Sequence, residues 1–504
     1  MSMWIWIMWI FPLLLVCFIL YSGYIYYIHM KYDHIPGPPR DSFFFGHLPS
    51  ILRVLENNGL VHDLFLEWVQ KYGPVIRINT FHNVKILLCN PEGIKEILMS
   101  PKYKKDAEYR HAHNLFGERF MGNGLVTDQD NDHWSWQRKL MDPAFKKDYL
   151  IGLMETFNEK AEEMEEKLSE MADGESQIVM HEMLRRVTVD VIAKAAFGLD
   201  LGCHTLIPQA ISVVTKGLNE ALNPLAKYIP WKQAFIKEVQ RSIRLLRDTG
   251  RECIKRRKKA KERGQQLPND VLTQILNTSD LEKDCDLESL VDNFVTLIIG
   301  GMETTANFLT FAVMELAQNP EILEKVQFEV DGVMQTKKDF EYNDLEQFEY
   351  LSQVLKETLR LYPPAPGTSR ALEDEIVIDG VRIPPRVTVM VNSYIMGRLD
   401  QCYHDPLIFN PDRFHPDEAR PYFSYFPFSL GPRSCIGKEF AQMMAKVIIA
   451  KLVYNYHIKL VEGQTYKILG TGTLHLKDGL ICRVRHRTLK RIRRHLIFEP
   501  CINV

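Results

Sequence analysis

The pattern of apolar and polar positions sets the first residues apart from the rest of the chain. From Met3 to Ile28 the sequence is almost continuously apolar and aromatic, and residues 1–30 contain no Lys, Arg, Asp or Glu. A stretch of this length can cross a bilayer as one helix. Aromatic residues gather near its two ends, as in the interfacial belts of membrane proteins: Trp4, Trp6, Trp9, Tyr21, Tyr24, Tyr26 and Tyr27. We expect residues 1–30 to be a membrane anchor and residues 31–504 to form the main body.

The flanks of this stretch predict its orientation. Lys31 and Arg40 follow it and no cation precedes it, so the rule that positive charges stay in the cytosol places the N-terminus in the lumen and the body in the cytosol. A cleaved signal peptide would carry a charged start and a small-residue cleavage site, and neither is clear here. A buried core helix is the alternative. The proline-rich residues 34–39 that follow are stiff and should set the angle between anchor and body.

Local periodicity predicts a mainly α fold with small β-sheets. Residues 74–88 are typical of two short strands around a turn, and residues 91–99 of a helix that begins at a proline. Residues 375–392 alternate around Asp379-Gly380 and predict a hairpin followed by a further strand. Residues 150–285 show mostly helical periodicity, and no repeat or low-complexity linker marks a domain boundary.

Residues 286–318 are apolar on nearly all sides, which is typical of a helix buried in a core. A helix of this length runs roughly 48 Å, enough to cross a domain. Asp292, Gly300 and Glu303 interrupt it too much for a second membrane span. The plainer interpretation of Gly300-Gly301 is a packing notch, and that of Thr304 is a bend through its i−4 carbonyl. The functional interpretation is an opening for O₂, with Glu303 and Thr304 as a proton relay.

Composition narrows the choice of function. The 504 residues carry a net charge of −2 with a sequence pI near 6.8, so there is no basic footprint of a nucleic-acid-binding protein. The nine cysteines are scattered and include no C-x-x-C pair. This argues against a disulfide framework or a structural zinc site and favours a reducing compartment.

One cysteine stands in an unusual setting. Cys435 lies in the stretch FSLGPRSCIG, two residues after Arg433 and just before an apolar-periodic run typical of a helix. The positive end of a helix and a nearby arginine both favour a thiolate, which could be an axial ligand of haem iron. The alternative is a small buried hydrophobe. A phosphate loop is excluded, because the glycine spacing is one residue too long and Glu439 replaces the required Ser or Thr.

Two spaced pairs and one basic run complete the candidates. Trp134 and Arg138 are one helical turn apart, as are Glu357 and Arg360. By spacing alone these are an ordinary amphipathic helix and a weak surface ion pair. The basic run at residues 255–263 is typical of a solvated helix face, with a membrane-surface or partner role as the alternative.

Phe428, Gly431, Arg433, Cys435 and Gly437 match F-x-x-G-x-R-x-C-x-G, and the chain here resembles the cytochrome P450 family. The resemblance implies a P450 fold, with residues 31–504 as the haem-thiolate catalytic domain. It implies haem b with Cys435 as the axial ligand of the iron, O₂ as co-substrate, and NADPH as the electron source through a reductase. The family's other motifs are matched by W-x-x-x-R at Trp134, by G-G-x-E-T-T at Gly300, by E-x-x-R at Glu357 and by P-x-R-F at Pro411.

The motifs imply roles for individual residues. Trp134, Arg138, Arg370 and Arg433 would hold the haem propionates, and Phe428 would form an aromatic wall beside the haem. Glu303 and Thr304 would deliver protons. Glu357, Arg360 and Arg413 would form a buried structural network.

Longer segments, among them KYGPV and YLSQVLKETLRLYPPA, look like the family's cholesterol 24-hydroxylases. This implies hydroxylation of a sterol side chain, NADPH–cytochrome P450 reductase as partner and the endoplasmic reticulum membrane as location. Candidate substrate contacts are Phe81, Phe120, Met121, Ile299, Gly300, Ala365, Pro366 and Thr473. Met121, Pro366 and Ser369 replace aromatic residues of those enzymes, so fatty acids and xenobiotics are alternative substrates. A non-catalytic haem sensor or carrier is the alternative from another class.

Overall fold

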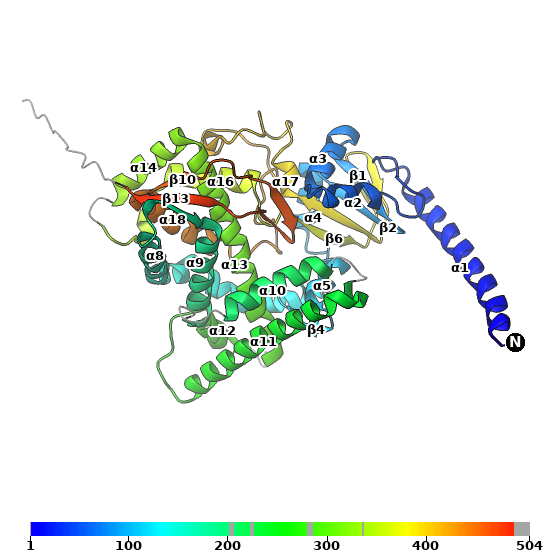
Figure 1. Cartoon of the computed structure of the whole chain (residues 1–504), viewed down its shortest axis with the longest axis horizontal. Helices are drawn as coiled ribbons and strands as arrows, with labels where there is room; N and C mark the ends of the chain where they lie inside the picture. The colour runs from blue at the N-terminus through cyan, green and yellow to red at the C-terminus, as the bar shows by residue number, and fades with distance from the viewer. Residues whose placement is uncertain (1, 201–205, 222–225, 280–285, 335–336, 488–504) are drawn as a thin grey trace, which may run out of the picture.

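The computed structural model describes residues 2–200, 206–221, 226–279, 286–334 and 337–487. The body is built mainly of helices, with a small mixed sheet on the side nearest the N-terminal helix (Figure 1). The expected mainly α fold with small sheets is therefore confirmed. The basic C-terminal tail after residue 487, for which the sequence suggested no role, lies outside the described residues.

The helices follow one another along the whole chain. They are α1 (Ser2–Tyr32), α2 (Leu48–Glu56), α3 (Val61–Tyr72), α4 (Pro91–Met99), α5 (Arg110–His113), α6 (Asn131–Met141), α7 (Lys147–Ile151), α8 (Met154–Ser169), α9 (Met180–Phe197), α10 (Leu206–Ala221), α11 (Gln233–Glu262), α12 (Val271–Ser279), α13 (Leu287–Gln318), α14 (Pro320–Met334), α15 (Tyr342–Glu346), α16 (Glu349–Leu361), α17 (Ser393–Met396) and α18 (Lys438–Asn455). Short 3₁₀ helices include η2 (Asp142–Phe145) and η5 (Pro411–Phe414).

The strands form one mixed sheet and several smaller antiparallel units. They are β1 (Val75–Thr80), β2 (Asn83–Leu88), β3 (Asn114–Leu115), β4 (Glu118–Arg119), β5 (Asp173–Val179), β6 (Gly367–Leu372), β7 (Ile376–Ile378), β8 (Val381–Ile383), β9 (Val387–Asn392), β10 (Tyr456–Leu460), β11 (Ile468–Thr471), β12 (Thr473–Leu476) and β13 (Ile481–His486). The mixed sheet has the order β1-β2-β9-β6, in which β2 and β9 run parallel. The others are β10-β13-β5 and the hairpins β3-β4, β7-β8 and β11-β12.

The long helix α13 passes through the core, as its all-round apolar pattern predicts. It is capped by Asp286, whose carboxylate accepts from the Ser289 amide at 2.5 Å, and it packs against α9 and α11. Most of its apolar length is buried inside the body. This burial agrees with the prediction that residues 286–318 are not a second membrane span, because a helix buried in the protein core needs no bilayer.

Helix α1 differs from α13 in its exposure. It extends away from the body (Figure 1), and its stretch from Pro12 to Tyr32 is long and apolar enough to cross a bilayer while remaining mostly exposed. Its C-terminal turns pack on the body, where Ile25, Ile28 and Tyr32 are buried. A long exposed apolar helix needs another apolar environment, so α1 is a candidate membrane span.

One strand lies where the sequence shows mostly helical periodicity. β5 falls within residues 150–285 and is paired with β13, about three hundred residues later in the chain. The strand-and-turn predictions at residues 74–88 and 375–392 and the helix at 91–99 are confirmed. Those elements are specified by near neighbours in sequence, whereas β5 depends on a distant pairing partner.

Candidate active site

Cys435 ends a tight loop that leads into α18. Its amide donates to the carbonyl oxygen of Phe428 at 2.9 Å, and the helix begins three residues later at Lys438. Gly431 in this loop has φ +68°, and a Cβ there would stand 2.1 Å from the carbonyl oxygen of Leu98 on α4. The loop therefore packs directly on α4, and glycine is required at position 431.

The thiol of Cys435 lies deep in the protein but is not covered by protein atoms. Burial raises its pKa, while a hydrogen bond from the Gly437 amide and the charge of Arg138 lower it. The side chain nevertheless keeps accessible surface. A thiol that is desolvated and still accessible faces an internal space, and that is the setting a metal-bound thiolate requires.

The cation beside this thiol is Arg138, so the expectation that Arg433 favours the thiolate is wrong. Arg433 is turned towards α6, where its Nη1 and Nη2 donate to Asp128 O at 2.9 Å and to Asn131 Oδ1 at 2.8 Å. Although Arg433 is only two residues from Cys435 in sequence, its guanidinium is directed towards α6 and away from the sulfur.

Helix α6 is fastened to the cysteine loop by two arginines. Arg138 Nη1 donates to Ser434 O at 2.7 Å, and its Nε donates to Asp142 Oδ1 at 2.6 Å. The Arg433 guanidinium lies 4.0 Å from the ring centroid of Trp134, which is buried. The W-x-x-x-R pair and the cysteine loop are thus in direct contact.

Arg370 on β6 carries an unsatisfied donor. The residue is only 2% exposed, and its Nη1 donates to Thr368 Oγ1 and to Ser369 O, each at 2.9 Å. Its Nη2 is buried and has no hydrogen-bond partner among the described residues. An unpaired buried guanidinium nitrogen is costly, so this atom fits a site for an acceptor that the protein itself does not supply.

Two further cations stand close to Arg370. Burial and Arg370 together lower the pKa of Arg433 to about 10, and burial lowers the pKa of Lys105, with further contributions from Arg370 and Arg433. None of the three forms an ion pair with a carboxylate of the described chain. Three clustered cations and a free donor fit a ligand that carries carboxylates, as the propionates of haem do.

Lys105 was missed by the sequence reasoning. It stands in the run Lys102–Lys105, and nothing in the spacing separates it from its neighbour Lys104, which pairs with Glu373 at 3.6 Å. Only the tertiary structure distinguishes the lysine that joins Arg370 from the one that pairs at the surface.

The glycine notch of α13 opens onto free space. A Cβ at Gly300 would meet nothing within 4 Å, whereas one at Gly301 would touch Ile192. Thr304 Oγ1 donates to Gly300 O at 2.6 Å, which is the i−4 bond that the plainer interpretation expects. Thr304 is half-exposed in this otherwise buried helix, so its oxygen can still accept a hydrogen bond from a group in that space.

Glu303 faces different neighbours from Thr304. Burial raises the pKa of its carboxyl, and Arg185, His475 and Asn307 lower it. Arg185 belongs to α9 and His475 to β12. Since burial dominates, Glu303 holds its proton to a higher pH than a free glutamate does.

Glu357 and Arg360 on α16 form a buried ion pair with two bonds. Arg360 Nε donates to Glu357 Oε2 at 2.6 Å and Nη2 to Oε1 at 2.7 Å, and both side chains have no exposed surface. Arg413 on η5 approaches the same carboxylate, at 3.4 Å. Arg360 also donates to the carbonyl oxygens of Gly397 and Pro406. This network joins α16 to the segment that precedes the cysteine loop.

Comparison with known proteins identifies the family. The model of the cytochrome P450 family matches residues 36–480. This chain belongs to the cytochrome P450 family. Its relatives include cytochrome P450 4F12 of Homo sapiens, at 28% identity over 84% of each chain. The carotene epsilon-monooxygenase of Arabidopsis thaliana is 27% identical over 84% of this chain and 81% of that protein. The ultra-long-chain fatty acid omega-hydroxylase of Homo sapiens is 26% identical over 89% and 88%.

Membership has consequences for cofactor and reaction. P450s are monooxygenases that hold haem iron through a cysteine thiolate and use O₂. The desolvated but accessible thiol, the free donor of Arg370 and the nearby cations without a carboxylate partner among the described residues fit this cofactor.

The candidate substrate contacts of this P450 do not all face one space. Gly300 and Ala365 keep accessible surface, and Ile299 is nearly buried beside Gly300. Phe81 is 38% exposed in the turn between β1 and β2, with its ring against that of Phe45. The neighbouring His82 lies against Tyr21 of α1. Phe81 therefore lies on the outer surface near α1.

The remaining candidates are mostly covered by protein. Phe120 is fully buried and Met121 nearly so. The Pro366 carbonyl oxygen accepts from the Ser393 amide at 2.7 Å. Ser369, which stands where cholesterol 24-hydroxylases are expected to have an aromatic residue, donates to Asp106 Oδ1 at 3.0 Å. Its side chain is thus engaged with the loop before α5.

The last candidate is Thr473, and Val126 is an exposed apolar residue near the Trp134 helix that was not among the candidates. Thr473 accepts a hydrogen bond from Asn307 Nδ2 at 3.2 Å, which joins β12 to α13. Val126 is 40% exposed between buried Leu125 and buried Thr127, and the sequence reasoning did not select it.

Proposed function

We propose that this P450 hydroxylates a long apolar lipid, with Cys435 as the thiolate ligand of haem. The observation that carries the proposal is the accessible but desolvated Cys435 thiol beside Arg138. Haem bound in this way activates O₂ and supplies the oxygen atom that is inserted into the substrate. Lys105, Arg370 and Arg433 would hold its propionates, together with Trp134 and Arg138.

Thr304 and Glu303 would manage protons. The Thr304 hydroxyl donates its proton to Gly300 O. Its oxygen therefore remains free to accept a hydrogen bond from a group in the open notch. Glu303, whose carboxyl has a raised pKa because of burial, would hold a proton for transfer on the same helix. Phe428 would form the wall behind the thiolate, and Glu357, Arg360 and Arg413 would support the cysteine loop.

A fatty-acid chain is the better supported substrate. One relative is named as an ultra-long-chain fatty acid omega-hydroxylase and another as a carotene epsilon-monooxygenase. By their names, these two relatives act on long apolar molecules. Side-chain hydroxylation of cholesterol is the second candidate. It rests on segments that look like those of cholesterol 24-hydroxylases, and the replacement of aromatic residues by Met121 and Pro366 weighs against an identical pocket.

The partner and the location follow from the anchor. We propose that α1 holds the protein in the endoplasmic reticulum membrane with its N-terminus luminal, and that NADPH–cytochrome P450 reductase supplies electrons from the cytosolic side. An apolar substrate would then reach the body from the bilayer, where such molecules are concentrated.

The test is a titration of the purified ferric protein with saturated fatty acids of increasing length, cholesterol and a panel of drug-like molecules. Displacement of water from the iron gives a spectral shift, and turnover with NADPH and reductase then gives products. Tight, length-dependent binding of fatty acids with hydroxylated products supports the first candidate, and a preference for cholesterol supports the second. Haem loading without any product from the whole panel would favour a sensor or carrier and overturn the proposal.

A further inference from the structure

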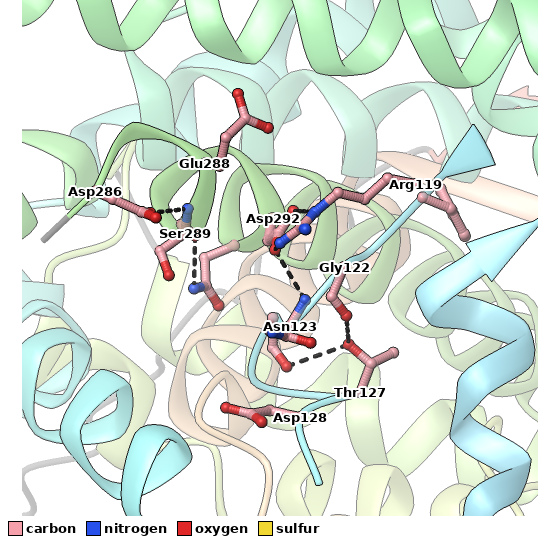
Figure 2. Close-up of polar contacts among 12 residues, drawn as sticks. Arg119, Gly122, Asn123, Thr127, Asp128, Asp286, Glu288, Ser289 and Asp292 are labelled. Carbon is pink, nitrogen blue, oxygen red and sulfur yellow. Dashed lines mark hydrogen bonds and ion pairs between the residues drawn. The ribbon is translucent and has the colours of Figure 1, made fainter. Parts of the chain in front are cut away.

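A buried carboxylate on α13 joins three separate segments of the chain. Asp292 has no exposed surface, and it accepts from Arg119 Nε at 3.0 Å and Nη2 at 2.5 Å, from Arg247 Nη1 at 2.7 Å and from the Asn123 amide at 2.8 Å. Figure 2 shows Arg119 of β4 and Asn123 of the following loop converging on it. These four bonds fill the acceptor positions of a carboxylate.

Loss of the Asp292 charge would be costly because of the charged groups around it. Arg247 on α11 is itself buried, and it also donates to Glu288 Oε2 at 2.6 Å and to Phe120 O at 3.1 Å. Arg251, one turn further along α11, donates to Glu288 at 2.9 Å. Loss of the Asp292 charge would leave Arg247 with Glu288 alone, and a buried charge that loses a partner is costly.

The loop that Asp292 binds rests directly on α13. We define the 120–128 loop as Phe120 to Asp128. Gly122 in this loop has φ +48°, and a Cβ there would lie 2.1 Å from Asp292 Oδ2. A Cβ at Gly124 would lie 2.2 Å from Thr296 Oγ1. Because both positions require glycine, the backbone can approach the helix closely enough for the Asn123 amide to reach the carboxylate.

The far end of the 120–128 loop is fixed to the haem side. The Leu125 amide donates to Asn293 Oδ1 at 3.0 Å, and Gln137 on α6 donates to Asp128 Oδ2 at 2.9 Å. The carbonyl oxygen of Asp128 accepts from Arg433 Nη1 at 2.9 Å. The loop thus bridges α13 and the arginine that stands two residues before Cys435.

The residues that bind this loop and the open notch lie on the same helix, α13. Gly300 follows Asp292 by eight residues, or about 12 Å along the helix. Among the apolar residues of the 120–128 loop, Phe120, Met121 and Leu125 are buried, and Val126 keeps accessible surface. We propose that Asp292 is a positioning residue that sets where this loop, and Val126 on it, stands against the substrate chamber, and thereby selects among apolar substrates. The inference rests on the proposed lipid hydroxylation.

The test uses the full-length holoenzyme with Asp292→Asn, which keeps the side-chain volume and removes the charge. Arg244→Gln is the matched control, because Arg244 also joins α11 to β4, through Glu118 at 3.3 Å, but on the exposed surface. We expect hydrogen exchange of the 120–128 amides to rise about tenfold or more in Asp292→Asn, since a hydrogen bond to a charged group is lost. The control should exchange like wild type.

Substrate selection is the second measurement. The ratio of the dissociation constants of a short and a long fatty acid, read from the ferric spectral shift, should change by about fivefold or more in Asp292→Asn. The carbon-monoxide spectrum should remain that of thiolate-bound haem. Gly122→Ala keeps the Asp292 charge but forces the loop away from it, so it should shift the same ratio in a protein whose charges are unchanged. If Asp292→Asn does not fold, the ratio measured for Gly122→Ala tests the inference instead.

Two results would overturn the inference. Wild-type exchange in the 120–128 loop would show that Asp292 does not hold it. Lower stability or haem content with an unchanged ratio of dissociation constants would show a purely structural role. Failure of the proposed function is separate, because it would appear in the wild-type protein as the absence of lipid binding and product, whatever the variants do.

Discussion

At the scale of single residues, the chemistry of this P450 depends on which side chains share the space around the Cys435 thiol. Burial opposes the thiolate, and the Gly437 amide and Arg138 favour it. A ferric ion would add a far larger positive charge and displace the proton. Of the chain's cysteines, Cys89, Cys402 and Cys482 are also desolvated, but they are covered by protein. Access rather than acidity therefore separates Cys435 from them.

The Cys435→Ser variant should lose the red-shifted Soret band of the reduced, carbon-monoxide-bound protein, because serine is a poor ligand for this iron. Cys402→Ser is the control, since Cys402 is a covered thiol, and it should retain the band. A retained band in Cys435→Ser would show that another residue is the ligand.

Thr304→Ala should leave haem and substrate binding nearly intact while lowering the product formed per NADPH and raising the release of hydrogen peroxide. The hydroxyl oxygen is needed only after O₂ has bound, so its removal acts on turnover rather than on affinity. Water and Glu303 could partly replace it, so activity should fall without vanishing.

Thr310→Ala is the matched control for this variant. Thr310 makes the same i−4 bond, to Ala306 O at 2.7 Å, in the same helix, but it is buried. If both variants changed coupling equally, or if Thr304→Ala matched wild type in product and peroxide, the proton-delivery role would be withdrawn.

At the scale of elements, α13 combines several tasks along one apolar helix. Its first turns bind the 120–128 loop through Asp292, its middle opens at Gly300, and its last turns bind α16, where Tyr362 OH donates to Glu315 Oε1 at 2.6 Å. Helix α11 shows a similar division. Most of its basic run at residues 255–263 faces outward, but Arg257 is buried against Asp270 at 2.6 Å. The basic run is thus mostly solvated, as the plainer interpretation expects, with one member that belongs to the core.

Glu357→Gln should lower the free energy of unfolding by about 3–5 kcal/mol, because it leaves the buried Arg360 with an uncompensated charge. Asp248→Asn is the control: Asp248 and Arg251 are also an i, i+3 pair, at 2.6 Å, but the carboxylate is exposed. This control should change stability by less than about 0.5 kcal/mol. Chemical denaturation of the two variants and wild type measures the difference, and equal effects would contradict a special role for the buried network.

At the scale of the whole molecule, a body with a buried core is joined to an exposed apolar helix. The turns of α1 nearest the body contact it through aromatic groups, including Phe18 on Phe44 and Tyr24 on His82. Phe43 and Phe45 are exposed nearby. The side of the body next to α1 is therefore apolar, and the bilayer that receives α1 would also meet this side.

The proposed cytosolic orientation of the body predicts that Asn277 stays unglycosylated in cells. Asn277-Thr278-Ser279 matches the acceptor sequence, and Asn277 is exposed at the end of α12, so access alone would not prevent modification. An acceptor sequence added ahead of residue 1 should instead gain sugar. Endoglycosidase-sensitive sugar on Asn277 would reverse the topology and remove the reductase as partner.

The sequence predicted most of the local elements and the individual motifs. The hairpins, the anchor pattern and the core helix depend on periodicity over short windows, and the cysteine loop and α16 pair depend on fixed spacing. Lys105, Val126 and Asp292 were not selected as site residues, because each has an ordinary local context. Asp292 is bound by a residue more than a hundred positions away, Arg119, and Lys105 stands near Arg370.

What the sequence by itself determined is therefore the apolar N-terminal helix that is a candidate membrane span, the mainly helical fold and the cysteine that can bind haem iron. Hydrophobic periodicity, segment length and motif spacing are local properties of the sequence, so they can be recognised without knowledge of the packing. The tertiary structure alone decided which cation stands at the Cys435 sulfur, which lysine joins Arg370 and which surfaces of the 120–128 loop are open. Each of these is an electrostatic or steric property of groups that only folding brings within a few ångströms of one another.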